Sequence, residues 1–310
     1  MSGNLLSKDW KYREIMPSAF SNSTTWMNLG YWKLPFTESE NTFEEANLAL
    51  ARKIGLLALL NDCSTILDLG CGRGDSLSLW ISPEFNYQRV FGVNSNLREY
   101  EEASKRFVED RRISLYYDDA IEFLERDFSN YTLTIVSIDA LYHFSPSRKV
   151  FFEKARETEA KRLAVSDILL SSKWALRDSL LWRLIKRCAL SVISFMGGVP
   201  FANLETPPES IGSMLTETGW KLNHLEIVTS NVFDPFASFC WIRARKFSLF
   251  SREKWTVLSS GFFMKFLAWS NILDFVIYSA EPDPRFSEKV KQQKISSPTK
   301  KRPVESCSKY

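Results

Sequence analysis

The chain has 310 residues, of which 45% are hydrophobic and 14% aromatic, and its formal net charge is +3. This composition supplies enough apolar side chains for a substantial core, and the small charge gives no reason to expect a nucleic-acid partner. Five scattered cysteines without a C-x-x-C pair, together with only two histidines, argue against a metal site. Because neither a secretory signal nor a clear transmembrane span is visible, we expect a cytoplasmic protein.

Residues 1–50 are expected to form an N-terminal lid and the first helix. Within them, Gly30 precedes two aromatic residues, Tyr31 and Trp32, so this segment can fold over a ligand. The alternative is that both rings only attach the arm to the core. A helix is predicted over 42–60, because the threonine at its start can cap it and acidic residues follow in the first turn.

The most informative stretch comes next. A short apolar run, Ile66-Leu67-Asp68-Leu69, predicts a buried strand, and Gly70, Gly72 and Gly74 predict the tight turn that leaves it. Because glycine has no Cβ, the backbone of such a turn can lie directly against a ligand. The helix expected from about residue 75 would point its free N–H groups at whatever lies over the turn.

The same stretch departs from the dinucleotide-binding pattern. Its spacing is G-x-G-x-G, whereas that pattern places the third glycine one position later. A site for NAD also carries an acid at the end of the next strand, but the strand predicted over 89–93 ends in Asn94, an amide. The acid stands instead at Asp68, where it would repel a pyrophosphate and suit a positively charged ligand.

The complete pattern D-L-G-C-G-x-G, from Asp68 to Gly74, resembles motif I of the class I S-adenosylmethionine-dependent methyltransferases, which bind a sulfonium cation. The resemblance implies that Asp68 and the glycine turn, with Cys71, hold the methionine end of the cofactor. The Gly-Tyr-Trp segment is similar to the lead-in of sterol, tocopherol and quinone methyltransferases, which implies that Tyr31 approaches the cofactor carboxylate or sulfonium. The alternative is a tight turn in some other doubly wound domain.

The end of the second strand is assigned to the cofactor ribose by this resemblance. Asn94 and Ser95 occupy the position where most members carry an acid that accepts bonds from both ribose hydroxyls. The amide of Asn94 can still accept a bond through its carbonyl, but it is neutral and can also donate. The helix predicted over 97–110 is strongly charged and is expected to face solvent.

The third strand, predicted over 113–117, ends at Asp118-Asp119-Ala120. The resemblance assigns Asp119, followed by the small Ala120, to the adenine amino group, with Asp118 as the fallback. Asp119 can also cap the helix predicted over 121–126, and the two roles can coexist.

The fourth strand, predicted over 131–138, runs into a group of chemically useful side chains. Ligands bind at the carboxyl ends of parallel strands in this architecture, so Ile138 is expected to contact the cofactor. An acid followed four residues later by a histidine, Asp139 and His143, is similar to sterol, tocopherol and cyclopropane-fatty-acid enzymes. The resemblance predicts His143 as the group that assists deprotonation, with Asp139 and Tyr142 shaping the pocket. The alternative is that His143 is a packed residue bonded to backbone.

A helical cap for the acceptor is predicted over 171–219, after a fifth strand over 161–169. Asp167, near the end of that strand, either faces substrate or caps a loop. Apolar residues recur at helical spacing in the cap, among arginines and lysines: Leu176, Leu180, Leu181, Leu184, Ile185 and Cys188. With Trp174 and Trp182, this stretch suits an apolar acceptor or a membrane-surface contact, the alternative being an amphipathic helix packed on the core.

The predicted fold class is α/β, a Rossmann-like doubly wound sheet of six parallel strands and an antiparallel last strand, with helical cap insertions. The sixth strand is predicted over 220–230, a largely helical stretch over 234–269, and the last strand over 273–280. The expected parts are the lid and first helix (1–50), the cofactor-binding core (51–170), the cap (171–219), the last strands with their intervening helix (220–281) and a disordered basic tail (282–310). The tail is also compatible with a nuclear address or an anionic surface.

These ordered motifs predict an S-adenosylmethionine-dependent methyltransferase that acts on a small, apolar or lipid-like acceptor. Two alternatives stay open. One is a methyltransferase-like binding protein without activity, which Asn94 favours. The other is a nucleotide-dependent oxidoreductase, which Asp68 disfavours. A peripheral membrane contact is compatible with the sequence, which predicts no particular oligomeric state.

Overall fold

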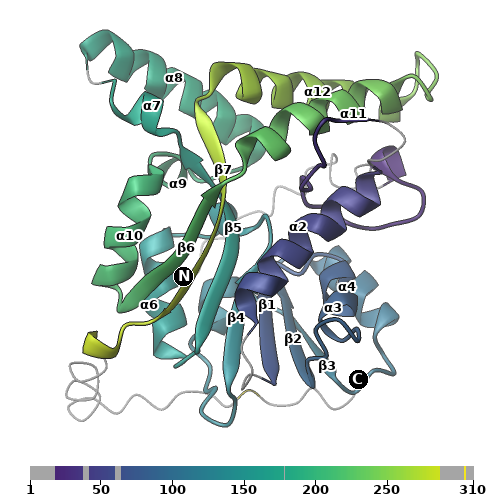
Figure 1. Cartoon of the computed structure of the whole chain (residues 1–310). Helices are drawn as coiled ribbons and strands as arrows, with labels where there is room; N and C mark the ends of the chain where they lie inside the picture. Colours follow the sequence, from purple (N-terminus) through teal and green to yellow (C-terminus); the bar gives the residue numbers. More distant parts are fainter. Residues whose placement is uncertain (1–17, 38–41, 60–63, 178, 287–303, 305–310) are drawn as a thin grey trace, which may run out of the picture.

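The protein is built around one mixed β-sheet, seen in a computed structural model that describes residues 18–37, 42–59, 64–177, 179–286 and 304. The strand order is β3-β2-β1-β4-β5-β7-β6 (Figure 1). The strands are β1 Thr65–Leu69, β2 Arg89–Asn94, β3 Ile113–Tyr117, β4 Leu133–Ser137, β5 Arg162–Leu170, β6 Trp220–Ile227 and β7 Leu273–Pro282. Strands β1 to β5 pair in parallel, and β7 is antiparallel to both β5 and β6. The predicted fold class is confirmed.

Helices cover both faces of this sheet and one of its ends. Those that follow or precede the core strands are α2 Phe43–Ala58, α3 Asp75–Trp80, α4 Leu97–Arg106, α5 Ala120–Phe123, α6 Arg148–Glu157 and α10 Pro208–Glu217. The cap contains α7 Ser172–Ala175, α8 Leu180–Gly197, α9 Phe201–Leu204, α11 Phe233–Ala244 and α12 Arg252–Ser270. Two 3₁₀ turns complete the elements, η1 Leu141–His143 and η2 Thr229–Asn231.

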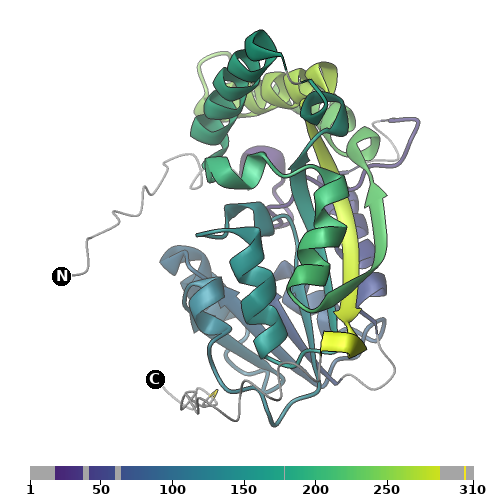
Figure 2. The ribbon, with the colours of Figure 1, turned by 90° about the vertical axis from the view of Figure 1, so that its left-hand side faces the viewer.

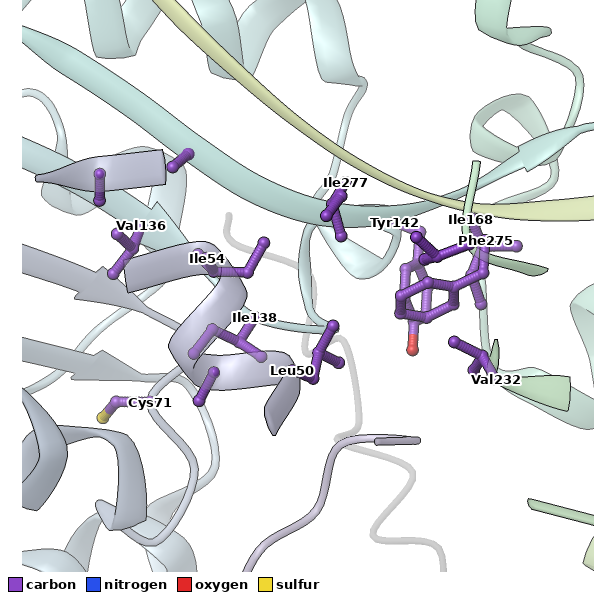
Figure 3. Packing of buried hydrophobic residues seen from close by; sticks show 14 of the residues in the cluster. Leu50, Ile54, Cys71, Val136, Ile138, Tyr142, Ile168, Val232, Phe275 and Ile277 are labelled. Atoms are coloured by element: carbon purple, nitrogen blue, oxygen red, sulfur yellow. The ribbon is translucent and has the colours of Figure 1, made fainter. Parts of the chain in front are cut away.

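The alternation of side chains along the strands divides the core into two layers. In β1, Ile66 packs in the cluster that contains Leu50 and Ile54 of α2, whereas Leu67 packs in the cluster that contains Phe151 of α6. Figure 3 shows the first cluster, with Leu50 and Ile54 beside Ile138, the residue that follows β4. Helix α2 therefore covers one face of the sheet and α6 the other (Figures 1 and 2).

Local signals in the sequence set several element ends. The Thr42 side chain accepts a hydrogen bond from the Glu45 backbone, and the Glu45 carboxylate accepts one from the Thr42 backbone, which confirms the predicted cap of α2. The helix predicted over 97–110 ends earlier, at Arg106, and the Asp110 side chain shapes the turn before β3 by accepting from the Arg112 backbone. The stretch predicted as helical over 234–269 is divided into α11 and α12.

The cap helices gather at the end of the molecule where the parallel strands finish, at the top of Figure 1. Strand β5 leads directly into α7, and α8 follows. The six apolar residues that the sequence singled out here are all exposed, and α8 buries Leu190 and Ile193 instead. The alternative in which those six residues pack on the core is therefore wrong. None of the helices in the described ranges is long and apolar enough to cross a membrane.

Only a small part of the predicted tail lies within the described residues. Strand β7 continues to Pro282, and Asp283 and Val304 are buried, so these residues belong to the folded body. The remainder of the tail, 287–303 and 305–310, which includes the basic stretch 300–303, lies outside the described residues.

Candidate active site

A cavity of about 1090 Å³ opens at the carboxyl ends of β1, β2 and β4 and extends beneath the cap. Its volume is at the upper end of those typical for small-molecule sites. One end is polar and is formed by the turn after β1 and the ends of β2 and β3. The other end is apolar and is walled by α8, α11 and α12, through Ile193, Met196, Phe236, Phe263, Met264 and Leu267.

Most of the residues predicted from the sequence meet around this cavity. Its lining includes Asp68, Gly70, Cys71, Gly72, Asn94, Ser95, Asp119, Ala120, Ile138, Asp139, Tyr142 and His143. Tyr31 and Gly74 do not line it. Tyr31 packs under the ammonium group of Lys53, 4.5 Å from the ring centroid, while Gly74 begins α3 with φ +88° and faces Phe107. A contact of these two residues with a ligand stays a prediction that the lining of this cavity does not support.

Two glycines of the turn after β1 serve different purposes. At Gly70, with φ +82°, an added Cβ would lie 2.6 Å from the Ala140 side chain, so a glycine is needed for close packing against the end of β4. At Gly72, with φ +55°, an added Cβ would meet no atom within 4 Å. This backbone therefore lies open to the cavity. Between them, burial raises the pKa of the Cys71 thiol, which stays neutral.

Asp68 is a buried carboxylate at the polar end of the cavity. The indole Nε1 of Trp80 donates a hydrogen bond to its Oδ2 at 2.8 Å. Burial is the main effect and raises the pKa of Asp68 to about 6, although bonds from Ser76 and Trp80 oppose the shift. A positively charged ligand next to this carboxylate would favour its ionised form.

Asn94 bonds to the backbone of the glycine turn and to Glu99, an acid that was not among the residues predicted from the sequence. The Asn94 amide nitrogen donates to the Gly72 carbonyl and to the Glu99 carboxylate, each at 2.9 Å, while its oxygen accepts from the Asn96 backbone at 3.0 Å. Glu99 is buried in the first turn of α4 and lines the cavity. The signal was present, because Asn96 is a helix N-cap just after the second strand and Glu99 stands three residues later, in the first turn of the helix.

Asp119 caps a helix, as the alternative for this residue predicted. Its Oδ1 accepts from the backbone of Ile121 at 2.8 Å and of Glu122 at 3.2 Å. The carboxylate also lines the cavity, so capping is compatible with a contact to a ligand amino group. Asp118 is held by Arg126 through a bond of 2.7 Å.

Asp139 joins three segments at the edge of the cavity. It adopts φ +54°, its backbone donates to the Ser166 hydroxyl, and its two carboxylate oxygens accept from the Leu29 backbone and the Tyr142 hydroxyl, all at 2.7 Å. Burial raises the pKa of Asp139 to about 6. The N-terminal segment therefore reaches the site through Leu29 and its neighbours 25–28, which line the cavity, rather than through the predicted tyrosine.

His143 ends η1 with its ring facing Tyr142, at a centroid distance of 4.4 Å. Its Nδ1 lies 3.2 Å from the carbonyl oxygen of Gly198, at the end of α8. A carbonyl can only accept, so this contact places the proton on Nδ1 and leaves the lone pair of the neutral ring on Nε2. The ring is thus bonded to backbone, as the alternative stated, and it also lines the cavity.

Asp167 neither faces a ligand nor caps a loop, which corrects both expectations for it. It is fully buried in a two-bond ion pair with Arg148, at 2.6 and 2.9 Å. Arg148 also donates to the backbone oxygen of Asn203, whose amide donates to the carbonyls of Tyr142 and Phe144 at 3.0 and 2.8 Å. This network holds η1, and with it His143, in position.

Comparisons with known proteins agree with this fold. No protein-family model matches the sequence. The O-methyltransferase resE of Aspergillus sclerotiorum is 27% identical over 152 residues, which are 47% of this chain and 54% of that protein. The match thus spans about half the length of the curated relative.

Solved structures match over most of the chain. A Galdieria sulphuraria protein assigned as a sarcosine dimethylglycine methyltransferase gives a TM-score of 0.68 at 15% identity, covering 88% of this chain and 98% of that one. The cyclopropane synthase MmaA2 of Mycobacterium tuberculosis gives 0.63 at 18% identity, covering 89% and 94%. The geranyl diphosphate C-methyltransferase of Streptomyces coelicolor A3(2), solved with Mg²⁺, geranyl diphosphate and S-adenosyl-L-homocysteine, gives 0.57 at 12% identity, covering 88% and 98%. The chain has the class I methyltransferase fold, and the resemblance seen in its motifs is confirmed at this level.

Proposed function

We propose that this protein is an S-adenosylmethionine-dependent methyltransferase that acts on a small, apolar or lipid-like acceptor. One observation carries the proposal. A single cavity has a polar end, with the Gly72 backbone and the buried carboxylates of Asp68 and Glu99, and an apolar end beneath the cap. His143 also lines this cavity. Fold neighbours solved with S-adenosylmethionine or its demethylated product include a cyclopropane synthase and geranyl diphosphate methyltransferases.

The residues at the polar end fit the cofactor. The open space at Gly72 admits a ligand against the backbone, and Asp68 supplies a buried negative charge for its positively charged methionine end. Glu99 offers carboxylate oxygens to the ribose hydroxyls, and Asp119 offers one to the adenine amino group. Asn94 was the feature that favoured a non-catalytic binding protein, and its pairing with Glu99 keeps an acid at the ribose position.

The chain's own residues would orient the reactants and move one proton. When bound, the cofactor supplies an electrophilic methyl group, so the protein has to hold a nucleophile about 3 Å from it, in line, and exclude water. His143 accepts the acceptor's proton at Nε2 while its Nδ1–H stays on the Gly198 carbonyl. Asp139 fastens the N-terminal segment over the site through the Leu29 backbone. We propose the cytoplasm as the compartment, because five scattered cysteines, an odd number, do not suggest a disulfide framework.

Calorimetric titration with S-adenosylhomocysteine, with NAD as the parallel ligand, tests the cofactor. Micromolar binding of the first alone supports the proposal, and binding of NAD alone contradicts it. Transfer of labelled methyl groups to sterols, quinones, isoprenoids and fatty acids then tests the reaction.

His143→Ala tests the catalytic part of the proposal. We expect kcat to fall by about 10²- to 10⁴-fold, the usual contribution of a positioned general base, with unchanged affinity for S-adenosylhomocysteine. The chain offers a matched control, because its second histidine, His224, is 43% exposed on β6 beside Glu226. His224→Ala should leave kcat unchanged. An unaltered rate in His143→Ala would remove His143 from the mechanism.

A further inference from the structure

Two cap helices carry a second apolar face that points away from the cavity. Helix α8 buries Leu190 and Ile193, and α12 buries Val257 and Leu267. At about 100° of rotation per residue, another set of apolar side chains falls on the opposite side of each helix. This set, the cap face, consists of Leu181, Leu184, Val192 and Phe195 of α8 and Trp255, Phe262, Phe266 and Trp269 of α12, each between 42% and 78% exposed.

The two halves of the cap face belong to one surface. Helices α8 and α12 lie at the same end of the molecule in both views (Figures 1 and 2). Trp174 of α7 connects them, because its Nε1 donates to the Ser270 carbonyl at the end of α12 and its ring packs edge-on against Trp182 of α8, with centroids 5.5 Å apart. The loop before α12 adds Phe250, which is almost fully exposed.

Positive charge accompanies this apolar surface. Helix α8 contains Arg183, Lys186 and Arg187 and no acidic residue. By the same rotation these three side chains fall on the side of α8 away from its exposed apolar stripe. Arg177 lies over the Trp182 ring at 4.2 Å. An apolar stripe with aromatic residues and a basic opposite side is the pattern of helices that lie in a membrane interface.

We propose that the cap face docks on the surface of an anionic phospholipid bilayer. The exposed leucine, phenylalanine and tryptophan side chains would enter the headgroup region, and the long basic side chains on the other side of α8 would extend to the level of the lipid phosphates. The net charge of α8, with three basic residues and no acidic one, favours an anionic surface over a second copy of the same basic helix. Contiguous exposed apolar surface of this kind marks an interaction site.

Docking in this way would place the apolar end of the cavity next to the bilayer. The inner sides of the same helices wall the cavity, through Met196 of α8 and Phe263 and Met264 of α12. Met196 is itself about half exposed, so it stands both at the surface and at the cavity. A lipid-like acceptor would enter between α8 and α12 without crossing water. This entry route rests on the proposed function, whereas the docking itself does not.

Flotation of the full-length protein with vesicles tests the docking. We expect binding to phosphatidylcholine vesicles that contain phosphatidylserine, and weaker binding to phosphatidylcholine alone. Leu181→Gln should lower the partition coefficient by about tenfold, since burying a leucine side chain is worth at least that factor. Leu56→Gln is the matched control, because Leu56 is an equally exposed leucine on α2, away from the cap. Lys186→Glu should lower binding only to the vesicles with phosphatidylserine.

Three results would overturn the docking. The first is that the full chain binds neither vesicle, and the second is that Leu56→Gln and Leu181→Gln lower the partition coefficient equally. The third is a dimer in sedimentation velocity that Leu181→Gln abolishes, because this would assign the cap face to a second copy of the chain. Calorimetry with S-adenosylhomocysteine on the same samples separates the two proposals. Cofactor binding without vesicle binding removes only the docking, and vesicle binding without cofactor binding removes only the proposed function.

Discussion

Asp68→Asn should stabilise the ligand-free protein at pH 8 while it weakens cofactor binding. Burial holds the pKa of Asp68 at about 6, against an ordinary value of 3.8. The folded state therefore binds this proton more tightly than the unfolded state, so the carboxylate lowers stability above pH 6 and the cost disappears as the pH falls from 6 towards 4. A difference of about two pKa units corresponds to about 3 kcal/mol. Asparagine keeps the acceptor for Trp80 but makes a weaker bond, which removes about 1 kcal/mol and leaves a net gain of about 2 kcal/mol.

Urea unfolding at pH 8 and at pH 4.5, followed by circular dichroism, measures this effect. We expect the gain at pH 8 and little or none at pH 4.5, where the wild-type carboxyl group is largely protonated. Asp110→Asn is the control of opposite sign, because Arg112 holds the pKa of Asp110 below its ordinary value and its carboxylate is therefore slightly stabilising. A variant Asp68→Asn that is less stable than wild type at pH 8 would refute the reasoning, since it would mean that the ionised carboxylate is stabilised by the fold.

Two further predictions concern residues that the sequence analysis did not identify. Glu99→Ala should weaken binding of S-adenosylhomocysteine by about 10- to 100-fold, because bonds to a charged acceptor are lost. Glu99→Gln should weaken it less, because one acceptor oxygen remains. If calorimetry gives both variants the affinity of the wild type, Glu99 is not in the ribose site. Arg148→Met should cost about 3–5 kcal/mol in urea unfolding, because it leaves the buried Asp167 charge unpaired. The double variant Arg148→Met/Asp167→Asn should recover part of that loss, and no recovery would show that the arginine acts through its other contacts.

The sheet and the cofactor end of the site could be predicted from the sequence because their signals are local. The strand with its acid and the alternating glycines that follow it are all contained in ten residues, from Ile66 to Asp75. The turn that this pattern predicts needs no distant partner. The cap of α2 by Thr42 and the cap of α5 by Asp119 are also contained within one helical turn. At such positions the sequence and the fold agree because the same few residues determine both.

The errors arise where a side chain's partner is far away in the sequence. Asp167 lies near the end of its strand where ligands bind, but its carboxylate forms an ion pair with Arg148, nineteen residues earlier. Tyr31 was expected at the cofactor by resemblance, whereas the residue of this segment that is held at the cavity is Leu29, through a backbone bond to Asp139, 110 residues later. Neither pairing has a periodicity or spacing that the sequence could reveal, since each depends on how separate elements pack.

The cap shows a different reason for failure. Apolar spacing on α8 was compatible with an acceptor pocket, a membrane-surface contact or a helix packed on the core, because periodicity records which side chains are apolar and not what covers them. Helix α12 has apolar residues on two opposite sides, one towards the cavity with Met264 and Leu267 and one outward with Phe262 and Trp269. A helix that is apolar on all sides is normally enclosed by protein or lipid. The described protein covers only one side of α12, so its outward side is the surface for which we propose a partner, and the basic residues of the neighbouring α8 are the reason for proposing a negatively charged one.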